Sequence, residues 1–241
     1  MKLFGLDLKF YLLLLFPLLL VDCSCDEDES TPQQYDPMPD PASLYDGEPD
    51  PVDPGIRWRK DELTYYISSE TSDIPADQQR SIFASAFQNW SDVTLLNFTE
   101  VSSPGEADMT VGFGFDRHCS LYEIVNDLCP VGDSAAFDGP LGVLAHCYYP
   151  PLRGETPPTG PNYTGDCHFD DAEFWSVSEQ SVQGGIRLIE TATHEIGHGL
   201  GLNHSEDKAA IMFGIYLNII PKVELAADDI ARLPERYGSS E

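Results

Sequence analysis

The sequence HEIGHGLGLNH, which begins at His194, contains the side chains best suited to metal chemistry. It matches H-E-x-x-H-x-x-G-x-x-H at every fixed position. On a helix, His194 and His198 lie at i and i+4, so their imidazoles share one face, as two ligands of a tetrahedral Zn²⁺ require. Glu195 lies beside them and is predicted to be the general base for a zinc-activated water. Gly201 is predicted to end the helix, so that the chain turns back and presents His204 as third ligand.

Three protein ligands leave the fourth position of a tetrahedral zinc ion open, which is typical of a catalytic site rather than a closed structural site. The chain has 6 histidines, and half of them belong to this motif. The remaining histidines lie upstream in a region rich in glycine and aspartate, where they are predicted to bind metal as well: His118, His146 and His168.

Helices and strands must position these side chains. The spacing of apolar residues predicts a helix from Pro75 to about Trp90 and a second helix from Gly184 to Leu200, which carries the first two zinc ligands. A third helix is predicted from Leu225 to Tyr237, interrupted near Pro234. Strands are predicted over residues 57–68, 98–101, 109–115 and 139–149. This order of elements indicates an α+β domain with helices packed against a twisted sheet.

The N-terminal region differs in composition from the rest of the chain, whose 241 residues suggest one domain with an extension. Lys9 precedes a short apolar run from Phe10 to Val21, which predicts a signal peptide over residues 1–25. A membrane anchor, or a surface lipoprotein modified at Cys23, is the alternative. Residues 26–55 are acidic, rich in proline and without Lys or Arg, so we expect a disordered linker or short propeptide ahead of a domain over residues 56–241.

The net charge limits the possible partners, and the cysteine content indicates the cellular compartment. The formal net charge of -28 argues against nucleic acid and anionic membranes as partners. Four cysteines beyond the signal region form two plausible pairs in an oxidising compartment, although the sequence does not prove the connectivity: Cys119 with Cys129, and Cys147 with Cys167.

Several further segments resemble the matrixins, a family of metzincin metalloproteases, over about Arg57 to Gly238. RWRKDELTYYI is similar to the opening strand of that family, and FDGPLGVLAH and GDCHFDDAEFW are similar to its metal-binding loops. Ser205 follows the third histidine as in matrixins, and AAIMFGIY resembles the Met-turn. The resemblance implies a metzincin fold: a five-stranded, mostly parallel sheet with one antiparallel edge strand, and three helices. An astacin-like metzincin is disfavoured by Ser205 and by the two loops.

The resemblance also implies how substrate is held. The edge strand, residues 144–148, would pair with an extended peptide through Leu144 and Ala145. Tyr216 would belong to the wall of the S1′ pocket, which receives the side chain after the scissile bond, and residues 217–224 would shape its depth. Met212 would form the hydrophobic floor beneath the zinc. The family usually has proline where Gly214 stands, so the sequence leaves the geometry of this wall open.

Further metal sites are implied by the same resemblance. A structural zinc would take His118, Asp133, His146 and His168, with an insertion after His118 that the Cys119–Cys129 pair would close off. A first calcium, which prefers oxygen ligands, would take side chains and carbonyls of Asp138, Gly139, Leu141, Val143, Asp170 and Glu173. A second calcium would use Asp108 and Asp166, and a third Asp73 and Asp171.

The sequence therefore predicts a secreted, monomeric zinc endopeptidase that hydrolyses extracellular proteins, by analogy including extracellular matrix. A non-catalytic zinc-binding adhesion or scaffold module is the alternative function, and loss of Glu195 would have been its sign. The family's propeptide motif P-R-C-G-x-P-D does not occur in the printed sequence. One hypothesis is that Asp46 in the acidic segment keeps the enzyme latent.

Overall fold

The computed structural model describes residues 56–115, 137–140, 142–150, 164–177, 185–216, 222 and 224–239. The predicted signal peptide and acidic segment lie outside these residues. Several predicted site residues also lie outside them: His118, Cys119, Cys129, Asp133 and Leu141.

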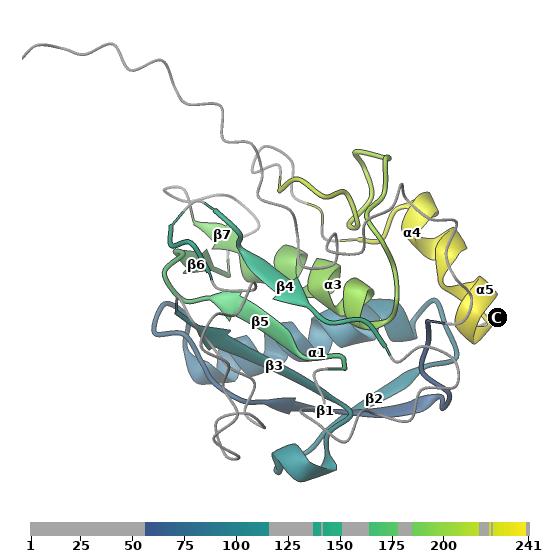
Figure 1. Ribbon diagram of the computed structural model, residues 1–241, viewed down its shortest axis with the longest axis horizontal. Helices are drawn as coiled ribbons and strands as arrows, with labels where there is room; N and C mark the ends of the chain where they lie inside the picture. Colours follow the sequence, from purple (N-terminus) through teal and green to yellow (C-terminus); the bar gives the residue numbers. More distant parts are fainter. Residues whose placement is uncertain are drawn as a thin grey trace, which may run out of the picture. The chain divides into compact units, whose positions relative to one another are not determined.

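A five-stranded sheet forms the centre of the described domain, in the order β2-β1-β3-β5-β4 (Figure 1). The strands are β1 (Glu62–Ile67), β2 (Asn97–Glu100), β3 (Met109–Gly114), β4 (Ala145–Cys147) and β5 (Cys167–Asp170). All neighbouring strands run parallel except β4, which lies at one edge and is antiparallel to β5. This is the arrangement that the family resemblance predicted.

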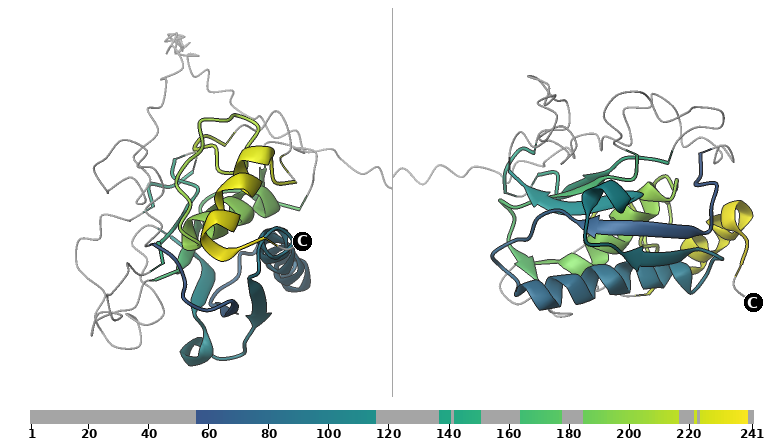
Figure 2. Two further views of the ribbon diagram at one scale, coloured as in Figure 1. Left: turned by 90° about the vertical axis from the view of Figure 1, so that its right-hand side faces the viewer. Right: turned by 90° about the horizontal axis from the view of Figure 1, so that it is seen from below.

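The helices are α1 (Ala76–Ser91), α3 (Leu188–Gly199), α4 (Ala227–Arg232) and α5 (Pro234–Tyr237), with a short 3₁₀ turn, η2 (Pro104–Glu106). Helix α1 follows Pro75 as predicted, because a fixed φ and a missing N–H suit the start of a helix. Pro234 divides the third predicted helix into α4 and α5. Helices α1 and α3 lie side by side against the sheet (Figures 1 and 2).

The predicted helix from Gly184 was too long at its start. Residues Ile186–Arg187 form strand β7, which pairs in parallel with β6 (Trp175–Ser176), and α3 begins only at Leu188. The apolar Ile186 and the apolar residues that follow Arg187 fit a buried strand as well as a helix, so their pattern did not separate the two.

Two predicted strands were also too long, and one strand was missed. Residues 57–61 are not part of β1, because Trp58 donates its backbone N–H to the hydroxyl of Tyr237 and its indole N–H to the carbonyl of Gly199 instead of joining the sheet. Strand β4 covers three residues of the apolar stretch 139–149. Strand β5 was not predicted from the pattern, because all four of its residues are buried and show no alternation.

Alternation along the strands separates the two faces of the sheet. One face carries apolar residues that pack against α1, including Tyr65, stacked on Phe87 at 4.1 Å between ring centroids, and Phe169, 5.4 Å from Phe83. His146 and His168 are register partners on β4 and β5, one position away from Cys147 and Cys167. Because successive side chains point to opposite faces, the histidines lie on the other side of the sheet from the cysteines.

Cys147 and Cys167 form the disulfide that was one of the two predicted pairs. It links β4 to β5 and packs on the last turn of α3, where the Cys167 sulfur lies 3.8 Å from the carbonyl oxygen of Glu195. The bond therefore joins the edge strand to β5 and packs against the helix that bears the histidine motif.

Replacing both cysteines with serine is expected to lower the free energy of unfolding by about 3 kcal/mol, because the bond closes a loop with a sequence separation of 20. Denaturant unfolding under non-reducing conditions measures this change. The matched control is wild-type protein unfolded with reductant, which should lose a similar amount. Equal stability of the serine variant and the oxidised wild type would contradict the prediction.

Candidate metal centre

Three histidines converge at the end of α3. His194 and His198 lie one helical turn apart, and their Nε2 atoms are 3.1 Å from each other. The ring of His204 lies 5.2 Å and 5.0 Å from theirs, between centroids. One potential ligand atom from each residue lies within 4.8 Å of the others, and within the described ranges no other group of three acidic, cysteine or histidine side chains does so.

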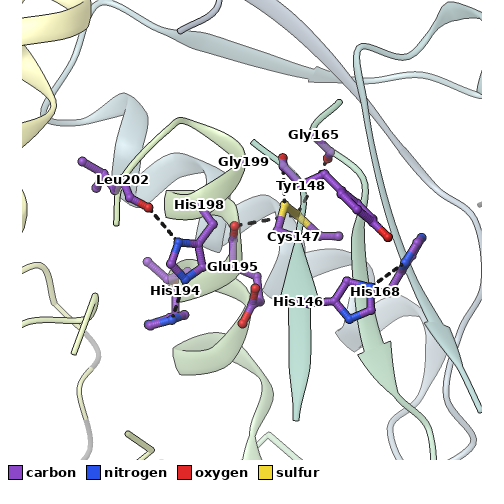
Figure 3. Close-up of a disulfide and its surroundings, with 12 residues drawn as sticks. His146, Cys147, Tyr148, Gly165, His168, His194, Glu195, His198, Gly199 and Leu202 are labelled. Atoms are coloured by element: carbon purple, nitrogen blue, oxygen red, sulfur yellow. Dashed lines mark hydrogen bonds between the residues drawn. A yellow bond between two sulfur atoms is a disulfide. The ribbon is translucent and has the colours of Figure 1, made fainter. Parts of the chain in front are cut away.

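Backbone carbonyls fix the orientation of two of these rings. The Nδ1 of His194 lies 2.8 Å from the carbonyl oxygen of Ile211, and that of His198 lies 2.7 Å from the carbonyl oxygen of Leu202 (Figure 3). A carbonyl can only accept, so each Nδ1 carries the proton and each Nε2 presents its lone pair. This fixed orientation suits a zinc ion, which binds the Nε2 of a neutral imidazole.

A glycine turn brings the third histidine back toward the helix. Gly201 has φ of 97°, in the left-handed region that the sequence predicted for it. Its N–H donates to the carbonyl of His198 at 2.8 Å, and the N–H of Leu202 donates to the carbonyl of Gly197 at 2.9 Å. These two bonds form a Schellman motif, which ends the helix and reverses the chain two residues before His204.

Met212 packs directly beneath the helix and is fully buried. A Cβ added to Gly197 would lie 2.4 Å from the Met212 sulfur and 3.0 Å from the Trp90 ring, so only glycine lets the helix approach this closely. The predicted position of Met212 below the histidines agrees with this packing.

Asp229 holds the Met212 segment in place, and the sequence analysis did not identify it. Its fully buried carboxylate accepts N–H bonds from Ile211 (2.8 Å), Met212 (3.0 Å) and Ala226 (2.8 Å). The neighbouring Asp228 accepts a bond from the Ser205 hydroxyl at 2.6 Å. The sequence did contain a signal for Asp229. This residue precedes the buried Leu233 by four positions, so its carboxylate lies on the same apolar face of the helix.

Replacing Asp229 with alanine is expected to lower the free energy of unfolding by about 3 kcal/mol or more, because three backbone N–H groups lose their acceptor. Denaturant unfolding measures this loss. Asp228→Ala is the matched control, with an expected cost of about 1 kcal/mol for one hydroxyl bond and a partly exposed ion pair with Arg232. Equal effects of the two substitutions would contradict this role of Asp229.

Glu195 is buried on the same turn of α3 as His194 and His198 (Figure 3). Its position next to the first histidine fits the role that the motif predicts, a base close to a metal-bound water. The backbone of Glu195 belongs to the helix and packs on the disulfide. The Glu195 side chain is therefore attached to a rigid element.

A second pair of histidines lies across β4 and β5. His146 and His168 are buried, and the Nε2 of one lies 3.1 Å from the Nδ1 of the other (Figure 3). Phe137 and Tyr148 pack on the His146 ring at 5.1 Å and 5.7 Å. Two of the residues predicted for the structural zinc are therefore adjacent, whereas His118 and Asp133 lie outside the described residues. The structural zinc stays a prediction.

The carboxylates predicted for the first calcium differ in burial. Asp170 and Glu173 are buried at the end of β5, and Asp138 is exposed and accepts the Val143 N–H at 2.9 Å. Gly139 has φ of 87°. Leu141 lies outside the described residues, and this site stays a prediction.

The residues predicted for the other calcium ions have protein partners. Asp108 accepts bonds from the N–H and hydroxyl of Thr64, at 2.7 Å and 2.9 Å, and forms an ion pair with Lys60. Asp166 is buried. Burial raises the pKa of Asp171, a hydrogen bond from Thr71 opposes this, and the nearby charge of Asp73 raises it further. Two carboxylates in this proximity suit a cation, but both calcium sites stay predictions.

The segment predicted to bind substrate forms the edge of the sheet. The carbonyl of Leu144 accepts the N–H of Asp170 at 2.9 Å, and the N–H of Tyr148 donates to the carbonyl of Asp166 at 3.0 Å, so pairing with β5 extends beyond β4 on both sides. Among the described strands, none pairs with the opposite side of β4. Ala145 and its neighbours are thus placed to add an extended peptide to the sheet.

Tyr216 contacts the residue that precedes α3. Its hydroxyl accepts the N–H of Arg187 at 2.9 Å, and the Arg187 guanidinium lies 5.3 Å from its ring centroid. Burial raises the pKa of Tyr216, while its bond with Arg187 opposes the shift. The phenol therefore stays neutral and fixed at physiological pH.

Comparisons with known proteins agree with this geometry. Residues 57–238 match the model of the matrixin family. The chain is 40% identical over 184 residues to macrophage metalloelastase from Rattus norvegicus, 37% over 184 residues to karilysin from Tannerella forsythia, and 37% over 188 residues to stromelysin-1 from Equus caballus. These alignments cover 76%, 76% and 77% of this chain but 34% of each relative. The chain thus spans about a third of the length of these relatives.

Proposed function

Because the chain belongs to the matrixin family, we propose that it is a zinc-dependent metalloendopeptidase that hydrolyses peptide bonds of extracellular proteins. The observation that carries this proposal is the histidine triad with Glu195 on the same helical turn. A non-catalytic zinc-binding module is not favoured, because such a module has no need of a buried carboxylate beside its zinc ligands.

His194, His198 and His204 would hold the catalytic zinc, with their donor set suited to that ion. When bound, zinc supplies a Lewis acid that polarises the scissile carbonyl and lowers the pKa of a coordinated water toward about 7. Glu195 takes a proton from the attacking water and passes it to the leaving amine. The carbonyls of Ile211 and Leu202 would keep the imidazoles in one tautomer and one orientation during these proton movements.

Substrate would bind in extended form along β4, with backbone bonds to residues 144–148. Tyr216 would form part of the wall that receives the side chain following the scissile bond. His146 and His168, with His118 and Asp133, would hold a structural zinc, and the carboxylates near Asp170 would hold calcium. These ions would brace the loops beside the edge strand rather than take part in the chemistry.

The protein is proposed to be secreted, with a signal peptide over residues 1–25 and an acidic linker or short propeptide over residues 26–55. A disulfide between β4 and β5 supports an oxidising compartment. Among the described residues, no helix has both the length and the apolar character needed to cross a membrane. We propose a monomer whose partners are its protein substrates.

The proposed activity is tested by hydrolysis of a quenched peptide with leucine after the scissile bond, by protein that begins near Gly55, with and without a zinc chelator. Cleavage that the chelator abolishes is expected. Failure of folded, zinc-loaded protein to cleave this peptide and an unbiased peptide mixture would contradict the proposed function.

A further inference from the structure

The third histidine of the triad, His204, is not held by a helix. His194 and His198 belong to α3, whose backbone bonds fix their spacing. His204 lies in the irregular segment after the glycine turn, so contacts made by its neighbours must determine where its imidazole lies. The residue before it, Asn203, makes two contacts with distant parts of the chain, one through its side chain and one through its carbonyl.

Tyr149, which lies just after the edge strand β4, reaches this segment although it is 54 positions away in the sequence. Its hydroxyl donates to Oδ1 of Asn203 at 2.8 Å. Its ring also lies edge-on to the imidazole of His198, with 5.9 Å between centroids and 89° between planes. One side chain outside the histidine motif thus contacts one predicted zinc ligand and the residue that precedes another.

Two further contacts restrain the same segment. Nη2 of Arg232 donates to the carbonyl of Asn203 at 2.9 Å and lies 3.4 Å from the carbonyl oxygen of His204. The ring of His204 packs closely on Gly214, where an added Cβ would lie 2.7 Å from the His204 Nδ1. The backbone and one side of the ring are therefore restrained, and the bond from Tyr149 adds a restraint that comes from the edge strand.

We propose that Tyr149 is a positioning residue for the catalytic zinc. Its hydroxyl fixes Asn203, which presents His204 to the metal, and its ring limits the rotation of His198. This inference rests on the metal centre of the proposed function. Groups that orient metal ligands without touching the metal typically contribute about 10–100-fold in metal affinity. A bond between half-buried side chains limits the conformations of His204, and so reduces the entropy lost when this histidine binds a metal.

The test measures zinc affinity by competition with a chelator of known affinity. Tyr149→Phe keeps the ring and removes the hydroxyl, and it is expected to weaken zinc binding about tenfold. Asn203→Ala removes the acceptor and should weaken zinc binding by a similar factor. Because a structural zinc is also proposed, the zinc bound by His204→Ala protein is subtracted from each measurement. Tyr66→Phe, which removes a half-buried hydroxyl on β1, is the matched control and should keep wild-type affinity.

A double-mutant cycle separates this bond from the other contacts of Tyr149. If the two groups act through one another, the double variant of Tyr149→Phe with Asn203→Ala should weaken zinc binding about tenfold, like each single variant. Independent effects would multiply to about a hundredfold and would overturn the proposal.

Cobalt(II) bound in place of zinc gives a second measurement, because its visible absorption depends on the geometry of its ligands. After subtraction of the spectrum of His204→Ala protein, the absorption should change in Tyr149→Phe and stay unchanged in Tyr66→Phe. A purely structural role of Tyr149 would lower the Tm of metal-free protein and leave both the cobalt spectrum and the zinc affinity as they are.

Wild-type zinc affinity and a wild-type cobalt spectrum in folded Tyr149→Phe protein would overturn this proposal. If that variant does not fold, wild-type affinity in Asn203→Ala would overturn it, and a loss of about tenfold there would support it. Wild-type protein that binds zinc and cleaves no peptide would overturn the proposed function alone, because affinity and spectrum are measured without substrate.

Discussion

Replacing Glu195 with alanine is expected to lower kcat by about 10²–10⁴-fold while the protein keeps its zinc. The carboxylate is buried on the turn of α3 that carries His194 and His198, where its proposed task is to move a proton between water and the leaving amine. The three histidines do not need this side chain to bind zinc. Peptide hydrolysis and zinc content, measured on the same preparation, test both parts of the prediction.

Two comparisons make the Glu195 result specific. Glu195→Gln keeps the size of the side chain but cannot accept the proton, and it should be about as inactive as the alanine variant. Glu206→Ala removes an exposed glutamate shortly after His204 and should leave kcat near the wild-type value. Wild-type activity in a zinc-loaded Glu195→Ala protein would exclude this residue as the general base.

Replacing His204 with alanine is expected to abolish detectable peptidase activity and to remove one zinc ion per chain. This histidine is half-buried and lies on the turn after α3, so its loss disturbs the core less than the loss of the buried His198. A ligand present at 1,000 times its Kd stabilises a folded protein by about 4 kcal/mol. The variant should therefore lose most of the increase in Tm that catalytic zinc gives to the wild type.

Metal analysis and thermal unfolding, with and without chelator, measure this loss. Because a structural zinc is also proposed, the relevant quantity is the difference between wild type and variant rather than the total. Glu206→Ala again serves as control and should retain both the zinc and its effect on Tm. A His204→Ala protein with wild-type zinc content and wild-type rate would exclude His204 as a ligand.

The elements that could be predicted are those whose defining residues all lie within one short segment of the sequence. The histidine motif gave the triad, because ligand spacing and the glycine that ends the helix lie within one short segment. Pro75 and the apolar positions after it gave α1, and Pro234 gave the break between α4 and α5. The sheet order depends on contacts between distant strands, and it came from the family resemblance rather than from periodicity.

Other features depend on partners far away in the sequence, and local patterns do not contain them. The burial of Asp229 is explained only by its bonds to the backbone of Ile211 and Met212. Residues 57–58 are not part of the sheet because Trp58 bonds to α5 and to the end of α3 instead. Strands β5 and β7 are buried on both sides, so alternation did not mark them. The buried ion pair of Arg187 with Glu190 likewise depends on where the helix starts.

The central claim is that zinc held by His194, His198 and His204 is required for hydrolysis, and metal restoration tests it most directly. Chelated, metal-free protein receives zinc in steps, and zinc content and peptide hydrolysis are measured at each step, with magnesium as control. We expect no hydrolysis without metal and a full return of the rate with zinc but not with magnesium. Hydrolysis at the full rate by protein shown to be free of zinc would contradict the claim, as would a folded, zinc-loaded protein that hydrolyses no peptide.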